Sequence, residues 1–153
     1  GIYILIIQYM DISGKNKNQN ALSERNGERT IITKEMMVAC CKRVVHYLQT
    51  EKRYTQPSYS LWELAHESGM TTKLISASIN AYMGQDFYEL MGRMRVEEAK
   101  RLLRAAAKAA EKVSVDEIGT ASGFNSRSTF FACFKKYAGM TPGKYMILSE
   151  ENK

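Results

Sequence analysis

The sequence is poor in the residues from which metal sites and disulfides are built. It has three cysteines, Cys40, Cys41 and Cys133, with no Cys-x-x-Cys pair, and its two histidines are His46 and His66. No metal site of recognised ligand spacing can be assembled from these residues. An odd number of cysteines without a framework is typical of a reducing cytosol. We therefore expect no metal, no cofactor, and thiols that pack as small apolar side chains.

Residues that would indicate an enzyme active site are also scarce. His66 shares a predicted helix with Glu63 and Glu67, but no nucleophile and no glycine-rich phosphate loop accompanies them. We interpret these three side chains as part of an exposed helix face. The sequence predicts no enzymatic activity.

The apolar run at the start of the chain is too short to cross a membrane. It covers Ile2–Ile7, whereas a spanning helix needs about 20 apolar residues, and no basic residues precede it as in a signal peptide. We interpret residues 1–10 as the apolar end of an upstream segment, because the chain begins with Gly1 and not Met. Two interpretations stay open, the cytoplasmic end of a membrane helix, which we favour, and a β-prone strand.

Positive charge is what the sequence has in excess. It contains 22 Lys and Arg against 16 Asp and Glu, which gives a net charge of +6 and a pI of about 9.2. This balance favours a polyanionic partner through long-range attraction. The 44% of hydrophobic residues is enough to build a folded core.

The chain divides into a polar first part and a helical remainder. Residues 11–35 are polar and interrupted by glycines, and we interpret them as a linker. Apolar residues at helical spacing begin at Met36, and that helix should end before Pro57. No alternating strand pattern follows residue 35, so the predicted fold class is all-α.

Capping residues mark where later helices begin. In a capping box a side-chain oxygen accepts a backbone N–H, and a Glu three residues later returns the bond. Three pairs fit this pattern, and Thr141 before Pro142 predicts a further start, since Pro suits the first helical position. The pairs are Ser60 with Glu63, Asp86 with Glu89, and Ser114 with Glu117.

An internal repeat organises the helical part. The segment Leu61–Gly84 resembles Val115–Gly139, each reading as a helix, a glycine turn and a second helix. A long amphipathic helix from Asp86 to about Arg104 connects the copies. Nineteen helical residues span about 28 Å, near the roughly 34 Å between equivalent major-groove positions one DNA turn apart. This match favours DNA binding more than the charge does.

The second copy resembles the signature of the AraC/XylS family of bacterial regulators. Residues of the connecting helix are also similar to the family, so the resemblance covers about residues 36–146, with 147–153 as a tail. The resemblance implies two homeodomain-like helix-turn-helix units joined by a long linker helix, which read adjacent major-groove segments. Phe124, Phe130 and Phe134 are expected to pack in the core. The signature residues are Ile118, Ser122, Gly123, Phe124, Asn125, Ser126, Arg127, Ser128, Phe130, Phe134, Lys135, Lys136, Gly139, Met140, Thr141, Pro142 and Tyr145.

The resemblance also implies which residues contact DNA. Base-facing positions would be Thr72, Lys73, Ser76, Ala77 and Asn80 in the first unit, and Arg127, Ser128, Phe131 and Ala132 in the second. Lys135 and Lys136 would contact phosphates. Direct readout is sparse, because Ala77 and Ala132 stand where the family often has a base-reading Arg.

Two further departures from the family concern the scaffold. Gly119 stands where the family usually has Ala, which should weaken its helix by about 1 kcal/mol at most. The alanine-rich stretch from Arg104 to Val113 replaces a connection that is often a shorter turn, and we expect it to favour helix.

The predicted partner is therefore double-stranded promoter DNA in the bacterial cytoplasm, with transcription activated or repressed through RNA polymerase. An upstream sensor domain would complete the full-length chain, anchored in the inner membrane if residues 1–10 end a membrane helix, and dimerisation would pass through that missing region. The alternative is a helical protein-interaction adaptor that keeps the fold without specific base readout.

Overall fold

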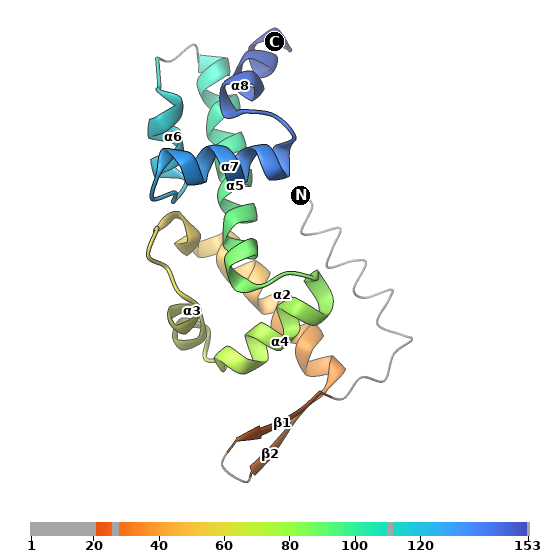
Figure 1. Ribbon diagram of the computed structural model, residues 1–153. Coiled ribbons are helices and arrows are strands. Elements are labelled where there is room, and N and C mark those ends of the chain that lie inside the picture. Colours follow the sequence, from red (N-terminus) through yellow and green to blue (C-terminus); the bar gives the residue numbers. More distant parts are fainter. Residues whose placement is uncertain (1–20, 26–27, 110–111, 153) are drawn as a thin grey trace. The chain divides into compact units, whose positions relative to one another are not determined.

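The computed structural model describes residues 21–25, 28–109 and 112–152 and is mainly helical (Figure 1). The predicted all-α class, with two helix-turn-helix pairs and a long helix between them, is confirmed. The elements in chain order are β1 (Ala21–Arg25), β2 (Glu28–Ile32), α2 (Lys34–Glu51), the 3-10 turn η1 (Arg53–Thr55), α3 (Leu61–Ser68), α4 (Thr72–Met83), α5 (Phe87–Ala109), α6 (Val115–Ala121), α7 (Arg127–Ala138) and α8 (Pro142–Glu151).

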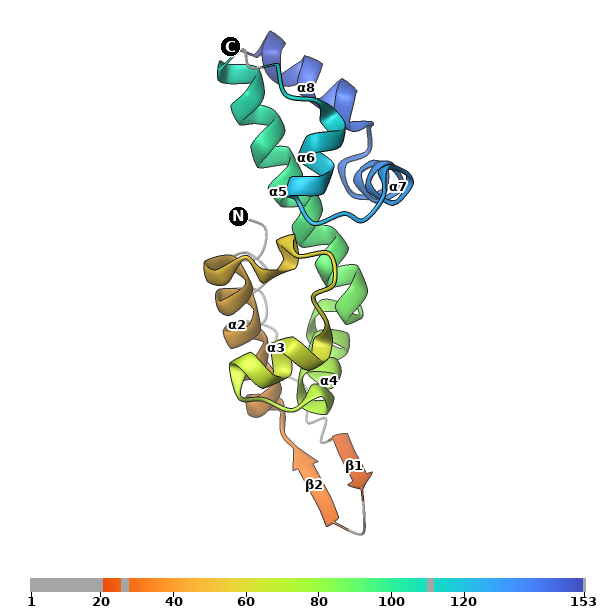
Figure 2. The same cartoon turned by 90° about the vertical axis from the view of Figure 1, so that its left-hand side faces the viewer.

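A two-stranded hairpin lies within residues 11–35, the segment that we interpret from the sequence as a polar linker. Strands β1 and β2 pair antiparallel, with Ala21 opposite Ile32 (Figure 2). The run of β-branched residues Thr30, Ile31 and Ile32 favours a strand, a preference that the polar composition of the whole segment concealed. The predicted segment 1–10 lies outside the described residues.

Contacts between Cα atoms divide the chain into two compact units. Unit 1 comprises the described residues up to Lys52 together with Ser60–Phe87, and so contains the hairpin and helices α2 to α4. Unit 2 comprises Arg53–Tyr59 together with the chain from Tyr88 onward. The short segment 53–59 therefore folds with unit 2, although helices of unit 1 flank it in the sequence.

Among the helices of unit 1, α2 supplies the most buried residues to the core. It begins at Lys34, two residues before the predicted start, because Thr33 is its N-cap and the Thr33 Oγ1 atom accepts the backbone N–H of Met36 at 3.2 Å. Its buried face packs against α4, where the Cys41 thiol donates to the Ser78 carbonyl at 3.3 Å. The buried residues of α2 are Met37, Cys40, Cys41, Val44, Val45 and Leu48.

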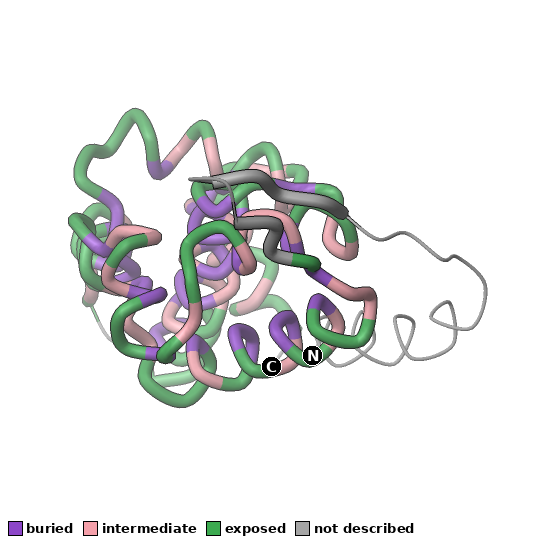
Figure 3. Tube along the Cα trace, turned by 90° about the horizontal axis from the view of Figure 1, so that it is seen from below, coloured by how far each residue is buried: buried purple, intermediate pink, exposed green. Residues whose placement is uncertain are grey.

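Aromatic rings fill the core of unit 2, as predicted. Phe130 is central, with ring centroids 5.1 Å from Phe124 and 5.8 Å from Phe134, and Tyr145 stacks edge-on against Phe134. Such tilted and edge-to-face pairs add to the stabilisation from burial. The buried cluster comprises Val96, Ala99, Leu103, Ala106, Ile118, Phe124, Phe130 and Phe134. Figure 3 shows buried and exposed positions recurring along the helices.

The two repeats share their local hydrogen bonds. Ser68 Oγ donates to the Leu64 carbonyl at 2.6 Å, and the equivalent Ser122 Oγ donates to the Ile118 carbonyl at 2.7 Å. Capping boxes are present at Ser60 and Ser114, as predicted. The repeat seen in the sequence is therefore also a repeat of structure, down to individual hydrogen bonds.

Gly119 has a packing role that differs from the one expected. A Cβ atom at this position would meet the Phe130 ring, with Cε2 and Cγ each at 2.9 Å. The glycine thus lets α6 approach the Phe130 ring closely, and it is not simply a weak point in the helix.

Helix α5 continues into the alanine-rich stretch and ends at Ala109. Its 23 residues make it about 35 Å long, which is longer than the 19-residue helix expected. In the described part of the chain, no helix has the length and apolar character needed to cross a membrane.

Candidate nucleic-acid interface

Helix α7 of unit 2 buries one face and presents the other to solvent. Ser126 caps its start by accepting the backbone N–H of Thr129 at 3.2 Å. Phe130 and Phe134 point into the core. Of the predicted base-facing residues, Arg127, Ser128 and Ala132 are exposed and Phe131 is half-buried.

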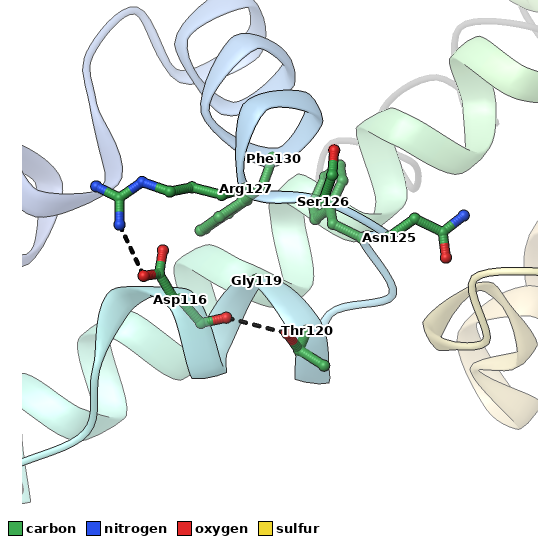
Figure 4. A pocket seen from close by; sticks show the side chains of 8 residues that line it. Asp116, Gly119, Thr120, Asn125, Ser126, Arg127 and Phe130 are labelled. Carbon is green, nitrogen blue, oxygen red and sulfur yellow. Dashed lines mark hydrogen bonds and ion pairs between the residues drawn. The ribbon is translucent and has the colours of Figure 1, made fainter.

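Arg127 is held from two sides while remaining open to solvent. Its Nη1 atom donates to Oδ2 of Asp116 on α6 at 2.7 Å, and its guanidinium carbon lies 4.6 Å from the centroid of the Phe131 ring. Figure 4 shows the Arg127 side chain reaching across to Asp116. The Arg127 side chain is nevertheless 67% exposed. A guanidinium fixed in this way keeps donors available for an anion or a base edge.

Two lysines extend the exposed face of α7 toward its end. Lys135 lies two turns after Arg127 on the same stripe, and Lys136 follows it. Both are exposed, and the Lys136 Nζ atom lies 5.2 Å from the centroid of the Tyr137 ring. The six predicted residues of unit 2 thus form one continuous face, with positive charge near both ends.

Helix α4 of unit 1 has the corresponding arrangement. Its N-cap Thr71 accepts the backbone N–H of Leu74 at 3.1 Å. Ile75, Ser78 and Ile79 are buried. The five predicted residues lie away from this core side, with Thr72, Lys73 and Asn80 exposed and Ser76 and Ala77 half-buried.

The Asn80 amide is engaged by its own helix. Its Nδ2 atom donates to the Ser76 carbonyl at 3.0 Å. Reading adenine with an Asn side chain takes both a donor and an acceptor, so this internal bond would have to open. The α4 face therefore offers Lys73 as its exposed cation and few preformed donors.

A half-buried arginine supports the turn before α7. Arg95 on α5 donates from Nε to the Tyr54 carbonyl at 2.6 Å and from Nη2 to the Gln56 carbonyl at 3.1 Å. Gly123 in the turn has a φ of +107°, and a Cβ atom there would meet the Tyr54 carbonyl oxygen. The segment 53–59 is thus clamped against the second helix-turn-helix turn, and only glycine fits at that contact.

The cysteine thiols are protected rather than reactive. Burial raises the pKa of the Cys41 thiol to about 12 and also raises the pKa of Cys40 and Cys133. A raised pKa keeps a thiol protonated and poorly nucleophilic. No cluster of three His, Cys, Asp or Glu suited to a metal ion occurs in the residues that the structure describes.

Sequence reasoning missed Asp116 and assigned no role to Trp62. Asp116 lies eleven residues before Arg127 and across a turn, so helical periodicity could not pair them. Its one signal is its place in the first turn of the helix preceding α7. Trp62 is 66% exposed on α3, and its ring stacks on that of His66 at 5.3 Å.

Known proteins resemble this chain in both sequence and fold. Residues 64–146, more than half of the chain, match the family described as "Helix-turn-helix domain". An AraC-like transcription regulator from Streptomyces lividans is 30% identical over 88 residues. These residues are 58% of this chain and 27% of the relative, so the chain matches about a quarter of that protein's length.

Solved structures extend the likeness to the fold. The C-terminal domain of AraT, a response regulator from Geobacillus stearothermophilus, matches with a TM-score of 0.58 and 25% identity, covering 70% of this chain and 83% of that chain. A DNA-binding transcriptional dual regulator from Escherichia coli K-12 shares the fold, with a TM-score of 0.59, 21% identity, and coverage of 87% and 99% of the two chains. The chain belongs to the AraC/XylS family of bacterial helix-turn-helix transcription regulators.

Proposed function

We propose that this chain binds double-stranded promoter DNA sequence-specifically, with α4 and α7 as recognition helices in the major groove. The observation that carries the proposal is the α7 face, where an exposed and oriented arginine is followed by two exposed lysines. Arg127 would contact a guanine edge, Phe131 and Ala132 would contact thymine methyl groups, and Lys135 and Lys136 would contact phosphates.

On α4, we propose a smaller contribution to direct readout. Lys73 would contact a guanine or a phosphate, while Thr72, Ser76 and Ala77 would line the groove. The half-buried Ala77 cannot donate a hydrogen bond from its side chain. Specificity in this half of the site would come largely from the shape of the DNA.

Salt dependence of binding tests the proposal. The chain is titrated onto a duplex selected from a random pool, and onto a random duplex of equal length, at several salt concentrations. Neutralised phosphates release counterions, so log affinity should fall linearly with log salt on both duplexes, with tighter binding to the selected one. Absence of both the slope and the preference would instead favour the protein-interaction adaptor.

Substitution of Arg127 tests the assignment of α7. Arg127→Ala should weaken binding to the selected site by about 1–3 kcal/mol and relax the preference at one base pair. The exposed Arg43 on α2, changed to Ala, is the control for loss of one positive charge. An equal loss on every sequence would make Arg127 a phosphate contact and not a base contact.

For the whole protein, we propose that this domain acts with parts outside the sequence described here. An upstream sensor domain would set its activity and provide for dimerisation, and RNA polymerase would be recruited or blocked at the promoter. Two observations support this proposal, the membership of the family and the match to only about a quarter of the length of a relative. The bacterial cytoplasm is where such DNA is found.

A further inference from the structure

Asp116 places a negative charge directly on the candidate DNA-contacting surface. It lies in the first turn of α6, and its carboxylate accepts a hydrogen bond from Arg127 Nη1 at 2.7 Å. The Asp116 side chain is 52% exposed. In Figure 4 Asp116, Thr120 and Arg127 line one small pocket beside the start of α7. Any polyanion that approaches Arg127 therefore also approaches this carboxylate.

The position of Arg127 explains why a carboxylate is useful there in the free protein. Arg127 is the first residue of α7, where the positive end of the helix dipole disfavours a cation. The first turn of α7 contains no acidic residue. Asp116 supplies the compensating charge from the neighbouring helix, and the guanidinium also packs over the Phe131 ring.

The same ion pair has different consequences on different DNA sequences. Near any duplex, the Asp116 carboxylate is repelled by phosphates and competes for Arg127, and this cost does not depend on sequence. At a site with a correctly placed guanine, Arg127 gains two acceptors, N7 and O6. An arginine already oriented by Asp116 and Phe131 loses less side-chain freedom in making that contact.

We propose that Asp116 is a specificity-determining residue, which orients Arg127 toward a base edge and raises the cost of binding to DNA that lacks the matching base. This inference rests on the proposed function. Asp116 would lower the affinity for DNA in general and raise the ratio of the affinity for the selected duplex to the affinity for random DNA. Asp116 acts through Arg127 and is therefore a positioning residue.

A double-mutant cycle tests the inference. Wild type, Asp116→Asn, Arg127→Ala and the double variant are titrated onto the selected duplex and onto a random duplex at one salt concentration. Asp116→Asn should bind random DNA about two- to fivefold more tightly, the range expected for an exposed ion pair. It should gain less on the selected duplex, so the ratio of the two affinities falls.

In the Arg127→Ala background, Asp116→Asn should leave that ratio unchanged, because there is no arginine to orient. Asp116→Glu keeps the charge and should retain part of the ratio. Glu150→Gln removes one exposed negative charge from α8 and should not change the ratio. Urea unfolding of each variant shows whether its fold is intact.

Two results would overturn the inference. In the first, Asp116→Asn changes both affinities by the same factor, which would make Asp116 only a bulk charge. In the second, the ratio falls equally with and without Arg127, so that Asp116 acts by another route. If the wild type shows neither sequence preference nor salt dependence, the failure belongs to the proposed function and not to Asp116.

Discussion

At the residue scale, the contact between Gly119 and Phe130 shows how a single missing side chain shapes the second helix-turn-helix unit. The Phe130 ring lies where a Cβ atom of residue 119 would be. From the sequence, Gly119 reads only as a poor helix former. The structure shows that the glycine and the phenylalanine are one packing arrangement, which no rule based on helical periodicity predicts.

Replacing Gly119 by alanine should therefore destabilise the chain. The added methyl group overpacks the core at a cost of about 1–3 kcal/mol, more than the roughly 1 kcal/mol that alanine gains in helix propensity. Urea unfolding measures the difference. Gly143→Ala on α8 is the matched control, since a Cβ atom there meets nothing within 4 Å, and it should be neutral or stabilising.

A second substitution identifies the cause of the loss. In the Phe130→Leu background the ring that blocks residue 119 is gone, so Gly119→Ala should cost less than it does in the wild type. An equal cost in both backgrounds would mean that the clash with Phe130 is not the reason.

At the element scale, capping residues predicted helix starts well because their signal is local. The starts of α3 and α6 follow from Ser60 and Ser114, each with a Glu three residues later. The end of α5 was predicted less well, since nothing in the alanine-rich stretch stops a helix before Ala109. The β1–β2 hairpin was missed because its strands are short and lie in a polar segment.

The η1 turn depends on a buried tyrosine whose ionisation provides a test. Burial, reinforced by the nearby Glu98 carboxylate, raises the pKa of Tyr54 to about 12. The unfolded chain loses the Tyr54 proton near pH 10, whereas the folded chain keeps it to about pH 12. The stability that Tyr54 contributes is therefore complete below pH 10 and is lost as the pH rises from 10 to 12.

Tyr54→Phe should flatten that part of the pH profile. The free energy of unfolding of wild type and variant is measured by urea titration between pH 8 and 12 (a range about the tyrosine pKa values), and their difference isolates Tyr54 from other ionising groups. Tyr88→Phe, at a site that is 76% exposed, is the control for removing a phenol. Parallel wild-type and Tyr54→Phe profiles would contradict the assignment.

At the scale of the whole molecule, unit 2 is assembled from two separate pieces of chain. Residues 53–59 precede α3 in the sequence, yet they bind Arg95 and contact Gly123 in the second helix-turn-helix turn. The sequence repeat gave no sign of this arrangement, because pairing of Leu61–Gly84 with Val115–Gly139 omits the segment. Rules based on local sequence patterns cannot predict contacts between residues about 40 positions apart, such as those of Arg95 with Tyr54 and Gln56.

Truncation tests this dependence. A fragment of residues 60–153 lacks segment 53–59, whereas 53–153 contains it, and the two are otherwise identical. The shorter fragment loses both hydrogen bonds that the half-buried Arg95 guanidinium donates to segment 53–59, which should cost about 1–3 kcal/mol. We expect its aromatic near-UV circular dichroism signal to be lost at lower urea. Coincident unfolding curves would show that the segment is dispensable.

The split composition of unit 2 also governs how such regulators can be recombined. A single crossover after Phe87 would combine the later part of unit 2 from one regulator with segment 53–59 from another. Exchange of the second unit between relatives therefore takes two cuts, with residues 53–59 travelling together with the chain from Tyr88 onward. In chimeric regulators, residues 53–59 should therefore decide whether a transferred unit 2 folds stably.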